Sequence, residues 1–205
     1  MNILELCSGI PEYVANNPGP AVSCATAKSY IYLPLTTTIA TMKEATIVYW
    51  GENLGNGIHI MSQNIAALNG YNGLWKTGNV WQYAGCGTES VFPEPYISNW
   101  AFYAFVLNNN TDTATAYFNN NYSISSTGCA GAALISVTSV NVGDYLPTCA
   151  DNTPGNYSNV QFYDTALSAN DIKTLYQEGI GGAPFDLQDL VGWWPMLPLI
   201  PITIM

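Results

Sequence analysis

The sequence predicts an all-β protein in which two antiparallel sheets pack face to face as a sandwich, with one short helix near residues 169–178. About ten or eleven short segments rich in aromatic and β-branched residues follow one another, separated by Asn, Gly and Pro turns. No helical pattern lies between these segments, which excludes a parallel α/β sheet. The single helix signature comes after the last segments of this series.

The expected strands can be followed in order along the chain. We place them at residues 2–6, 30–35, 45–50, 58–62, 74–76, 80–83, 100–107, 113–118, 122–126, 133–142 and 160–164. A loop with three prolines and two glycines covers residues 8–23. The three residues 77–79, Thr-Gly-Asn, favour a hairpin between the fifth and sixth strands. Residues 100–107 are apolar at odd and even positions alike, which predicts burial on both faces.

The helix is predicted by its start and stop signals. Ser168 is the expected N-cap, and Asp171 three residues later completes a capping box. Leu167 and Ile172 on either side of this start form the expected hydrophobic staple. Gly179 ends the helix at a position that favours a left-handed residue. The apolar face of the helix comprises Ile172, Leu175 and Tyr176.

Residues 162–179, FYDTALSANDIKTLYQEG, resemble the closing strand, turn and helix of laminin-G-like (type 3) domains in the concanavalin A-like lectin and glucanase superfamily. The early strands and central hairpin of that family are resembled by SYIYL at 29–33, ATIVYW at 45–50, NWAFYAF at 99–105 and TATAYFNNN at 113–121. The resemblance implies a concanavalin A-like jelly roll over residues 29–189, preceded by an N-terminal strand and loop at 1–28. CSGIPEYVAN near the start is similar to archaeal pilin-like surface proteins.

The apolar tail, residues 190–205, leaves three interpretations open. Its first part, LVGWWP, resembles the segment that opens laminin-G-like domains, although here it follows the closing helix. It therefore begins a truncated second repeat, or it returns as a closing strand beside the N-terminal edge. A frameshift that makes residues 196–205 non-native is the third interpretation. The tail is short and contains three prolines, so a membrane-spanning helix is not expected.

The charge composition excludes one class of partner. Only 9% of the 205 residues are charged, the formal net charge is −10, and there is no arginine. The four lysines are Lys28, Lys43, Lys76 and Lys173. Because binding to nucleic acid depends on lysine and arginine contacts to phosphate, we expect no nucleic-acid partner. A polar surface of Asn, Ser, Thr and Tyr suits an extracellular or cell-surface protein.

The five cysteines lie in loop-like sequence contexts, which favours disulfides. We expect the pairs Cys7–Cys24 and Cys129–Cys149, with Cys86 left over. In the alternative interpretation, all five are reduced and act as small hydrophobic residues.

Two further features bear on export. The triplets that begin at Asn109, Asn121 and Asn156 match the N-glycosylation pattern and fall in expected turns. Residues 1–10 have no basic start and no apolar core of a signal peptide. We therefore expect an export segment to lie upstream of this sequence.

The best candidate for sugar binding is the predicted hairpin around residues 74–83. Sugars stack on exposed aromatic rings, and nearby amides supply hydrogen bonds. Trp75, Trp81 and Tyr83, with Asn72 and Asn79 in the turns, form this candidate cluster. The alternative is that these side chains pack in the core or at a sheet edge. We expect Trp50 and Trp100 to fill the core.

Calcium is the one cofactor that the sequence suggests. Calcium prefers clustered oxygen ligands from loops, which Asp144, Asp151 and Asn152 could provide. The alternative is that these residues only form turns. Many members of the resembled family carry Asp or Asn just before the SYIYL strand, where this chain has Ala25 and Lys28. This departure weakens the family's calcium site as a model.

The spacing of the acidic residues and the single histidine do not favour an enzyme. Glycoside hydrolysis needs two carboxyl groups facing each other, and the nearest match is Glu89 with Glu94. Val91 stands where glucanases have Asp, and Pro93 interrupts the strand, so turn carboxylates are the simpler interpretation. His59, the single histidine, alternates with apolar neighbours and is expected to be an ordinary strand residue.

The function predicted from the sequence is a non-catalytic extracellular recognition or adhesion module that binds a glycan or a protein partner. The alternative is a structural subunit of a surface filament or sheath, which associates by adding its apolar tail to the sheet of a neighbour. A glucanase-type hydrolase is the third interpretation.

Overall fold

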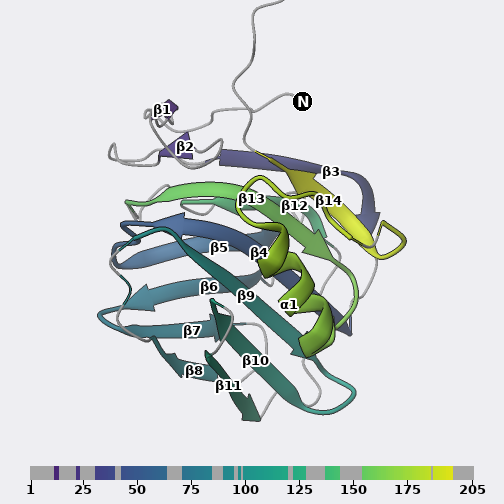
Figure 1. Cartoon of the computed structure of the whole chain (residues 1–205). Coiled ribbons are helices and arrows are strands. Elements are labelled where there is room, and N and C mark those ends of the chain that lie inside the picture. The colour runs from purple at the N-terminus through teal and green to yellow at the C-terminus, as the bar shows by residue number, and fades with distance from the viewer. Residues whose placement is uncertain are drawn as a thin grey trace, which may run out of the picture.

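The computed structural model describes residues 12–13, 22–23, 31–39, 43–63, 71–84, 90–94, 97, 99–119, 122–127, 137–143, 154–185 and 187–195. The described strands form two antiparallel sheets that face each other (Figure 1). The predicted all-β jelly-roll sandwich with one short helix is confirmed.

The eight-stranded sheet carries the helix on its outer face. Its strands, in spatial order, are β1 (Glu12–Tyr13), β2 (Val22–Ser23), β13 (Asn156–Tyr163), β4 (Glu44–Glu52), β9 (Ala101–Asn108), β10 (Thr113–Phe118) and β11 (Tyr122–Thr127). The eighth strand, β14 (Leu190–Trp194), also pairs with β13.

The six-stranded sheet packs against the inner face of the first. Its spatial order is β3 (Ile31–Ile39), β12 (Val137–Val142), β5 (Gly57–Gln63), β6 (Tyr71–Thr77), β7 (Val80–Ala84) and β8 (Ser90–Pro93). At one side of the sandwich β8 lies near β11, and at the other side β3 lies near β14.

The main core fills the space between the sheets. Side chains alternate along β10, where Ala114, Ala116 and Phe118 point inward and are buried. In contrast, β9 is buried at seven successive positions, as its two-sided apolar pattern predicted. Its second face is covered because Phe102, Ala104 and Val106 pack in the same cluster as the helix.

The helix α1 (Ala169–Glu178) begins and ends as predicted. The backbone N–H of Asp171 donates to Ser168 Oγ, and the N–H of Ser168 donates to Asp171 Oδ2, which is the capping box. Gly179 has φ 77° at the C-terminal cap. Ile172 and Leu175 are buried against the eight-stranded sheet, so this amphipathic helix covers the middle of its outer face (Figure 1).

A buried threonine fixes the turn that leads into the helix. Thr46 Oγ1 on β4 donates to the carbonyl of Thr165 at 2.7 Å and accepts the backbone N–H of Leu167 at 3.0 Å. These two bonds hold the Ala-Leu-Ser turn against the sheet.

Three strands differ from the sequence expectation. The short strands β1 and β2 lie in the stretch expected to be a loop, and β8 lies where Pro93 was expected to interrupt a strand. Pro93 is tolerated because it is the last residue of β8, which stands at the edge of its sheet. The expected strand at residues 2–6 lies outside the described residues.

The first part of the apolar tail is a strand of this same domain. Leu190–Trp194 pairs antiparallel with β13, and Trp194 is buried in the main core. Residues 196–205 lie outside the described part, and the three interpretations of the tail as a whole stay predictions. Within the described residues, no helix has the length and apolar character needed to cross a membrane.

Candidate functional site

The β6–β7 hairpin separates the two tryptophans of the predicted sugar-binding cluster. Trp75 pairs across the hairpin with Gln82, whereas Trp81 pairs with Lys76. Because successive side chains of a strand point to opposite faces, Trp75 and Trp81 lie on opposite faces of the sheet.

Trp81 is completely buried, so the expectation that it offers a ring to a sugar is wrong. It is one of the largest side chains of the main core and packs against Phe105, with ring centroids 5.4 Å apart. The core interpretation, stated above as the alternative, holds for this residue.

Trp75 remains on the outer face of the six-stranded sheet and is half-buried. Its indole N–H donates to the side-chain oxygen of Gln82, which is also half-buried. This bond orients the indole ring beside an amide. Asn79 is exposed in the turn of the hairpin, and the side chains of Asn72 and Tyr83 lie outside the described part.

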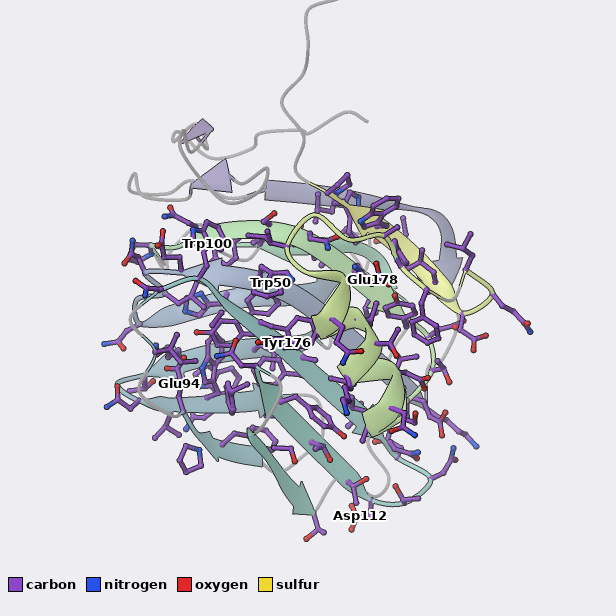
Figure 2. The ribbon with its side chains drawn as sticks, viewed as in Figure 1. Trp50, Glu94, Trp100, Asp112, Tyr176 and Glu178 are labelled. Carbon is purple, nitrogen blue, oxygen red and sulfur yellow. The ribbon has the colours of Figure 1, made fainter. Side chains whose placement is uncertain are left out.

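Glu94 is not a solvated turn carboxylate, which corrects the sequence interpretation. Its side chain is 5% exposed and forms an ion pair with Lys76, with Nζ 2.6 Å from Oε2. Tyr103 Oη donates to the other carboxylate oxygen at 2.8 Å. Burial and the neighbouring Glu94 charge raise the pKa of Tyr103, so this phenol stays neutral and keeps its donor. Figure 2 shows Glu94 beside the strand ends of the six-stranded sheet.

Lys76 is also positioned by two other contacts. Its Nζ donates to the carbonyl of Leu54 at 3.2 Å and lies 5.8 Å from the centroid of the Trp81 ring. Glu94 thus faces a cation and a phenol, and Glu89 lies outside the described residues. Whether Glu89 and Glu94 form the facing pair of carboxyl groups that glycoside hydrolysis needs therefore stays untested.

His59 is buried and bonded on both ring nitrogens. Nδ1 lies 2.6 Å from Tyr157 Oη, and Nε2 lies 2.7 Å from the carbonyl oxygen of Gly55. Burial lowers the pKa of His59 to about 3, so the ring is neutral at physiological pH. Its position in a strand was predicted, whereas its two partners were not.

A second aromatic surface was missed by the sequence analysis. Trp50 stacks on Tyr176 of α1 with ring centroids 5.9 Å apart and an interplanar angle of 18°. Both side chains are half-buried on the outer face of the eight-stranded sheet, beside the helix (Figure 2). The expectation that Trp50 and Trp100 fill the core is therefore wrong, because both side chains stay partly exposed.

Several predicted site residues lie outside the described part. They are the five cysteines Cys7, Cys24, Cys86, Cys129 and Cys149, the calcium candidates Asp144, Asp151 and Asn152, and the glycosylation candidate Asn121. Among the described residues, no group of three or more His, Cys, Asp or Glu side chains could hold a metal ion.

The other two glycosylation candidates have different surroundings. Asn109 lies in the turn between β9 and β10, where its backbone N–H donates to the carbonyl of Lys43. Asn156 begins β13 and donates to Glu52 Oε2 at 3.0 Å, and Ser158 of the same triplet is fully buried. The side-chain oxygen of Asn109 is buried and Asn156 is only partly exposed, so glycosylation at either position stays a prediction.

Comparison with solved structures identifies the architecture. The heptameric SAP-like pentraxin from Limulus polyphemus is similar, with a TM-score of 0.57 and 13% identity over 72% of this chain and 76% of its own. The chain has the jelly-roll sandwich fold. The binding domain of botulinum neurotoxin serotype G gives a TM-score of 0.64 and 15% identity, covering 85% of this chain. The enzymatically active domain of tailspike protein 2 from bacteriophage CBA120 gives 0.60 and 14%, covering 96% of this chain.

These similarities concern the jelly-roll sandwich alone. This chain spans 46% of the length of the toxin domain and 34% of that of the tailspike domain. No family model and no curated protein matches the chain. The resemblance to archaeal pilin-like proteins stays a prediction.

Proposed function

We propose that this jelly-roll sandwich is a non-catalytic extracellular recognition module, and that it binds a neutral glycan at the outer face of the β6–β7 hairpin. The supporting observation is the oriented pair formed by Trp75 and Gln82. A half-buried indole held beside an amide offers an apolar ring face and hydrogen-bonding groups to a sugar.

The charge of the chain favours a neutral ligand. With a formal net charge of −10, the molecule repels sulfated and other anionic glycans. Lys76, the lysine of this hairpin, is 13% exposed and already neutralised by Glu94.

Three structural neighbours are named as binding domains of botulinum neurotoxins, and one of those is named as a receptor-binding domain. Another neighbour is named as an enzymatically active domain. Binding is favoured over hydrolysis for this chain because the Glu94 carboxylate is buried and already bonded to Lys76 and Tyr103.

The test is binding of the purified chain to a panel of immobilised neutral oligosaccharides, with calcium and with a chelator. Trp75→Ala should weaken binding at least tenfold, which corresponds to about 1.4 kcal/mol. Phe185→Ala removes another exposed aromatic ring, 41% exposed, and should leave binding unchanged. If Trp75→Ala binds as tightly as the unchanged chain, the hairpin is not the site.

Trp50→Ala distinguishes the second aromatic surface from the first. We expect this variant to retain binding, because Trp50 is already stacked on Tyr176. Loss of binding in Trp50→Ala with retention in Trp75→Ala would place the site beside α1. Failure of every glycan to bind would favour the protein-partner alternative, to be sought at the same two surfaces.

The pairing of β14 within its own chain weakens the alternative of self-association through the apolar tail. Leu190–Trp194 already pairs with β13 of its own chain and buries Trp194 there, so this segment is not free to add to a neighbour's sheet. The filament alternative therefore rests on residues 196–205. Sedimentation at increasing concentration, with and without residues 196–205, would test it.

Placement outside the cell is part of this proposal. The low content of charged residues and the five loop-like cysteines support it. Non-reducing peptide mapping of the native protein should recover the Cys7–Cys24 and Cys129–Cys149 links, and free thiols at all four positions would count against an oxidising compartment.

A further inference from the structure

Five aromatic side chains form a closed ring between the two sheets. The five-ring cluster consists of Tyr49, Tyr103, Trp81, His59 and Tyr157. Taken in that order, neighbouring ring centroids are 5.2, 5.4, 4.8 and 6.0 Å apart, and a distance of 6.2 Å from Tyr157 back to Tyr49 closes the cycle. The three tyrosines come from β13, β4 and β9 of one sheet, and the other two residues come from β5 and β7 of the other.

Three members of the five-ring cluster have hydrogen-bond partners. Tyr103 Oη donates to Glu94, and His59 is bonded to both Tyr157 Oη and the carbonyl of Gly55. These bonds satisfy the polar atoms at the rim of the cluster.

The other two members each carry a buried polar atom. Tyr49 Oη and Trp81 Nε1 belong to side chains that are 0% exposed, and neither atom has a hydrogen-bond partner in the part of the chain that the structure describes. Their rings meet edge to face across the cycle, with centroids 6.5 Å apart and an interplanar angle of 60°. A buried donor without an acceptor carries the full penalty of desolvation, and native proteins commonly relieve it with an internal water.

We propose that the five-ring cluster holds an ordered internal water that accepts the indole N–H of Trp81 and hydrogen-bonds to Tyr49 Oη. An indole nitrogen can only donate, so the guest must offer an acceptor, which excludes a metal cation at this atom. Tyr49 also keeps its proton, because burial and the surrounding phenols raise its pKa.

Water fits this position better than a small anion. His59 is neutral here, and the cation nearest to Trp81, Lys76, is already paired with the Glu94 carboxylate. An anion would find no free positive charge among the described neighbours and would be repelled by Glu94. A water molecule accepts from one group and can donate to or accept from the other.

The test is water-selective NMR on the ¹⁵N-labelled chain, with the indole signal of Trp81 assigned from its loss in Trp81→Phe. We expect a cross-peak of the sign given by a long-lived water at this indole proton, together with slow hydrogen exchange. Absence of that cross-peak overturns the proposal whatever the stability data show.

Two matched variants locate the water. Tyr49→Phe removes one of its partners, so the cross-peak should weaken and the folding equilibrium constant should fall roughly fivefold. An increase in that constant would mean that the hydroxyl is simply unpaired, and would overturn the proposal. Tyr103→Phe removes a hydroxyl bonded to Glu94 instead and should leave the water cross-peak in place, while its loss there would contradict the assigned position.

Discussion

His59 and Tyr157 join the two sheets through a buried hydrogen bond of 2.6 Å between Nδ1 and Oη. The carbonyl of Gly55 can only accept, so it fixes the proton of the neutral imidazole on Nε2. Nδ1 is then the acceptor, and the Tyr157 hydroxyl is the donor. The pair therefore requires an uncharged histidine, which ties the stability of the sandwich to pH.

We expect acid to destabilise the fold through His59. In the unfolded chain the ring binds a proton near pH 6.5, whereas burial keeps the folded pKa at about 3. Between these values the unfolded state binds more protons, so the free energy of unfolding falls as the pH falls, by up to about 1.4 kcal/mol per pH unit. Urea denaturation of the unchanged chain and of His59→Gln between pH 7 and pH 4 measures this dependence.

The glutamine variant is the control for carboxylate titration, because its side chain does not bind a proton in this range. Its stability should vary less with pH than that of the unchanged chain. Parallel slopes in the two proteins would show that His59 is not the group responsible.

The ion pair between Lys76 and Glu94 predicts a strongly asymmetric mutational response. Lys76→Met leaves a carboxylate that is 5% exposed without its cation and should lower the free energy of unfolding by about 3–5 kcal/mol. The double variant Lys76→Met with Glu94→Gln removes both charges and should recover part of that loss. Equal stability of the single and double variants in urea denaturation would contradict the buried-charge explanation.

Local signals account for the parts of the fold that the sequence predicted. The capping box of Ser168 and Asp171, and the glycine at 179, act within one turn of chain, so they could be recognised without knowing any partner. The two-sided burial of β9 was visible because both of its faces are apolar.

The sequence analysis placed Trp81 on the wrong face of the sheet because the expected hairpin turn was one residue too long. A three-residue turn at 77–79 would place Trp75 opposite Trp81 on one face, as the sugar-binding interpretation required. The structure instead pairs Thr77 with Val80 around a two-residue turn, with Gly78 at φ 60°. This shift of register moves Trp81 to the core face and leaves Trp75 outside.

The environment of Glu94 could not be read from the sequence, because it depends on pairing across three strands. β7 pairs with β6 on one side and with β8 on the other, which brings Lys76 and Glu94 together around Trp81. The same reason applies to Trp50, whose stacking partner Tyr176 is supplied by a helix far along the chain.

Trp81 should behave as a core residue in any binding experiment. Trp81→Ala should lower the free energy of unfolding by about 3–5 kcal/mol, because it leaves a large cavity between the sheets. Chemical denaturation followed by circular dichroism measures this loss. If Trp81→Ala keeps full stability and loses only ligand binding, Trp81 is a contact residue and the burial assigned to it is wrong.

The glycine that ends α1 is required for its backbone conformation alone. Gly179 has φ 77°, and a Cβ added there would meet no atom within 4 Å. Gly179→Ala should therefore cost about 1–3 kcal/mol of purely conformational strain. Gly181→Ala is the matched control, since its Cβ would also meet nothing within 4 Å and its φ lies outside the left-handed region. The thermal midpoint should fall for Gly179→Ala only. Equal shifts in both variants would point to a common effect on the segment that follows α1.

Asn159 should anchor the last strand of the domain. Its side-chain oxygen accepts the indole N–H of Trp193 at 2.7 Å, and its Nδ2 donates to the carbonyl of Gly182 at 2.9 Å, while its own φ is 50°. Asn159→Ala adds the loss of these bonds to the strain of a left-handed alanine, so we expect a cost of about 2–4 kcal/mol. Hydrogen exchange at the backbone amides of Leu190–Trp194 should accelerate, because β14 loses its side-chain link to β13.

Asn53→Ala is the control. It carries similar strain at φ 54° on an exposed side chain and should cost only about 1 kcal/mol without affecting β14. A larger loss in Asn53→Ala than in Asn159→Ala would show that backbone strain, and not the Asn159 network, governs the attachment of this strand.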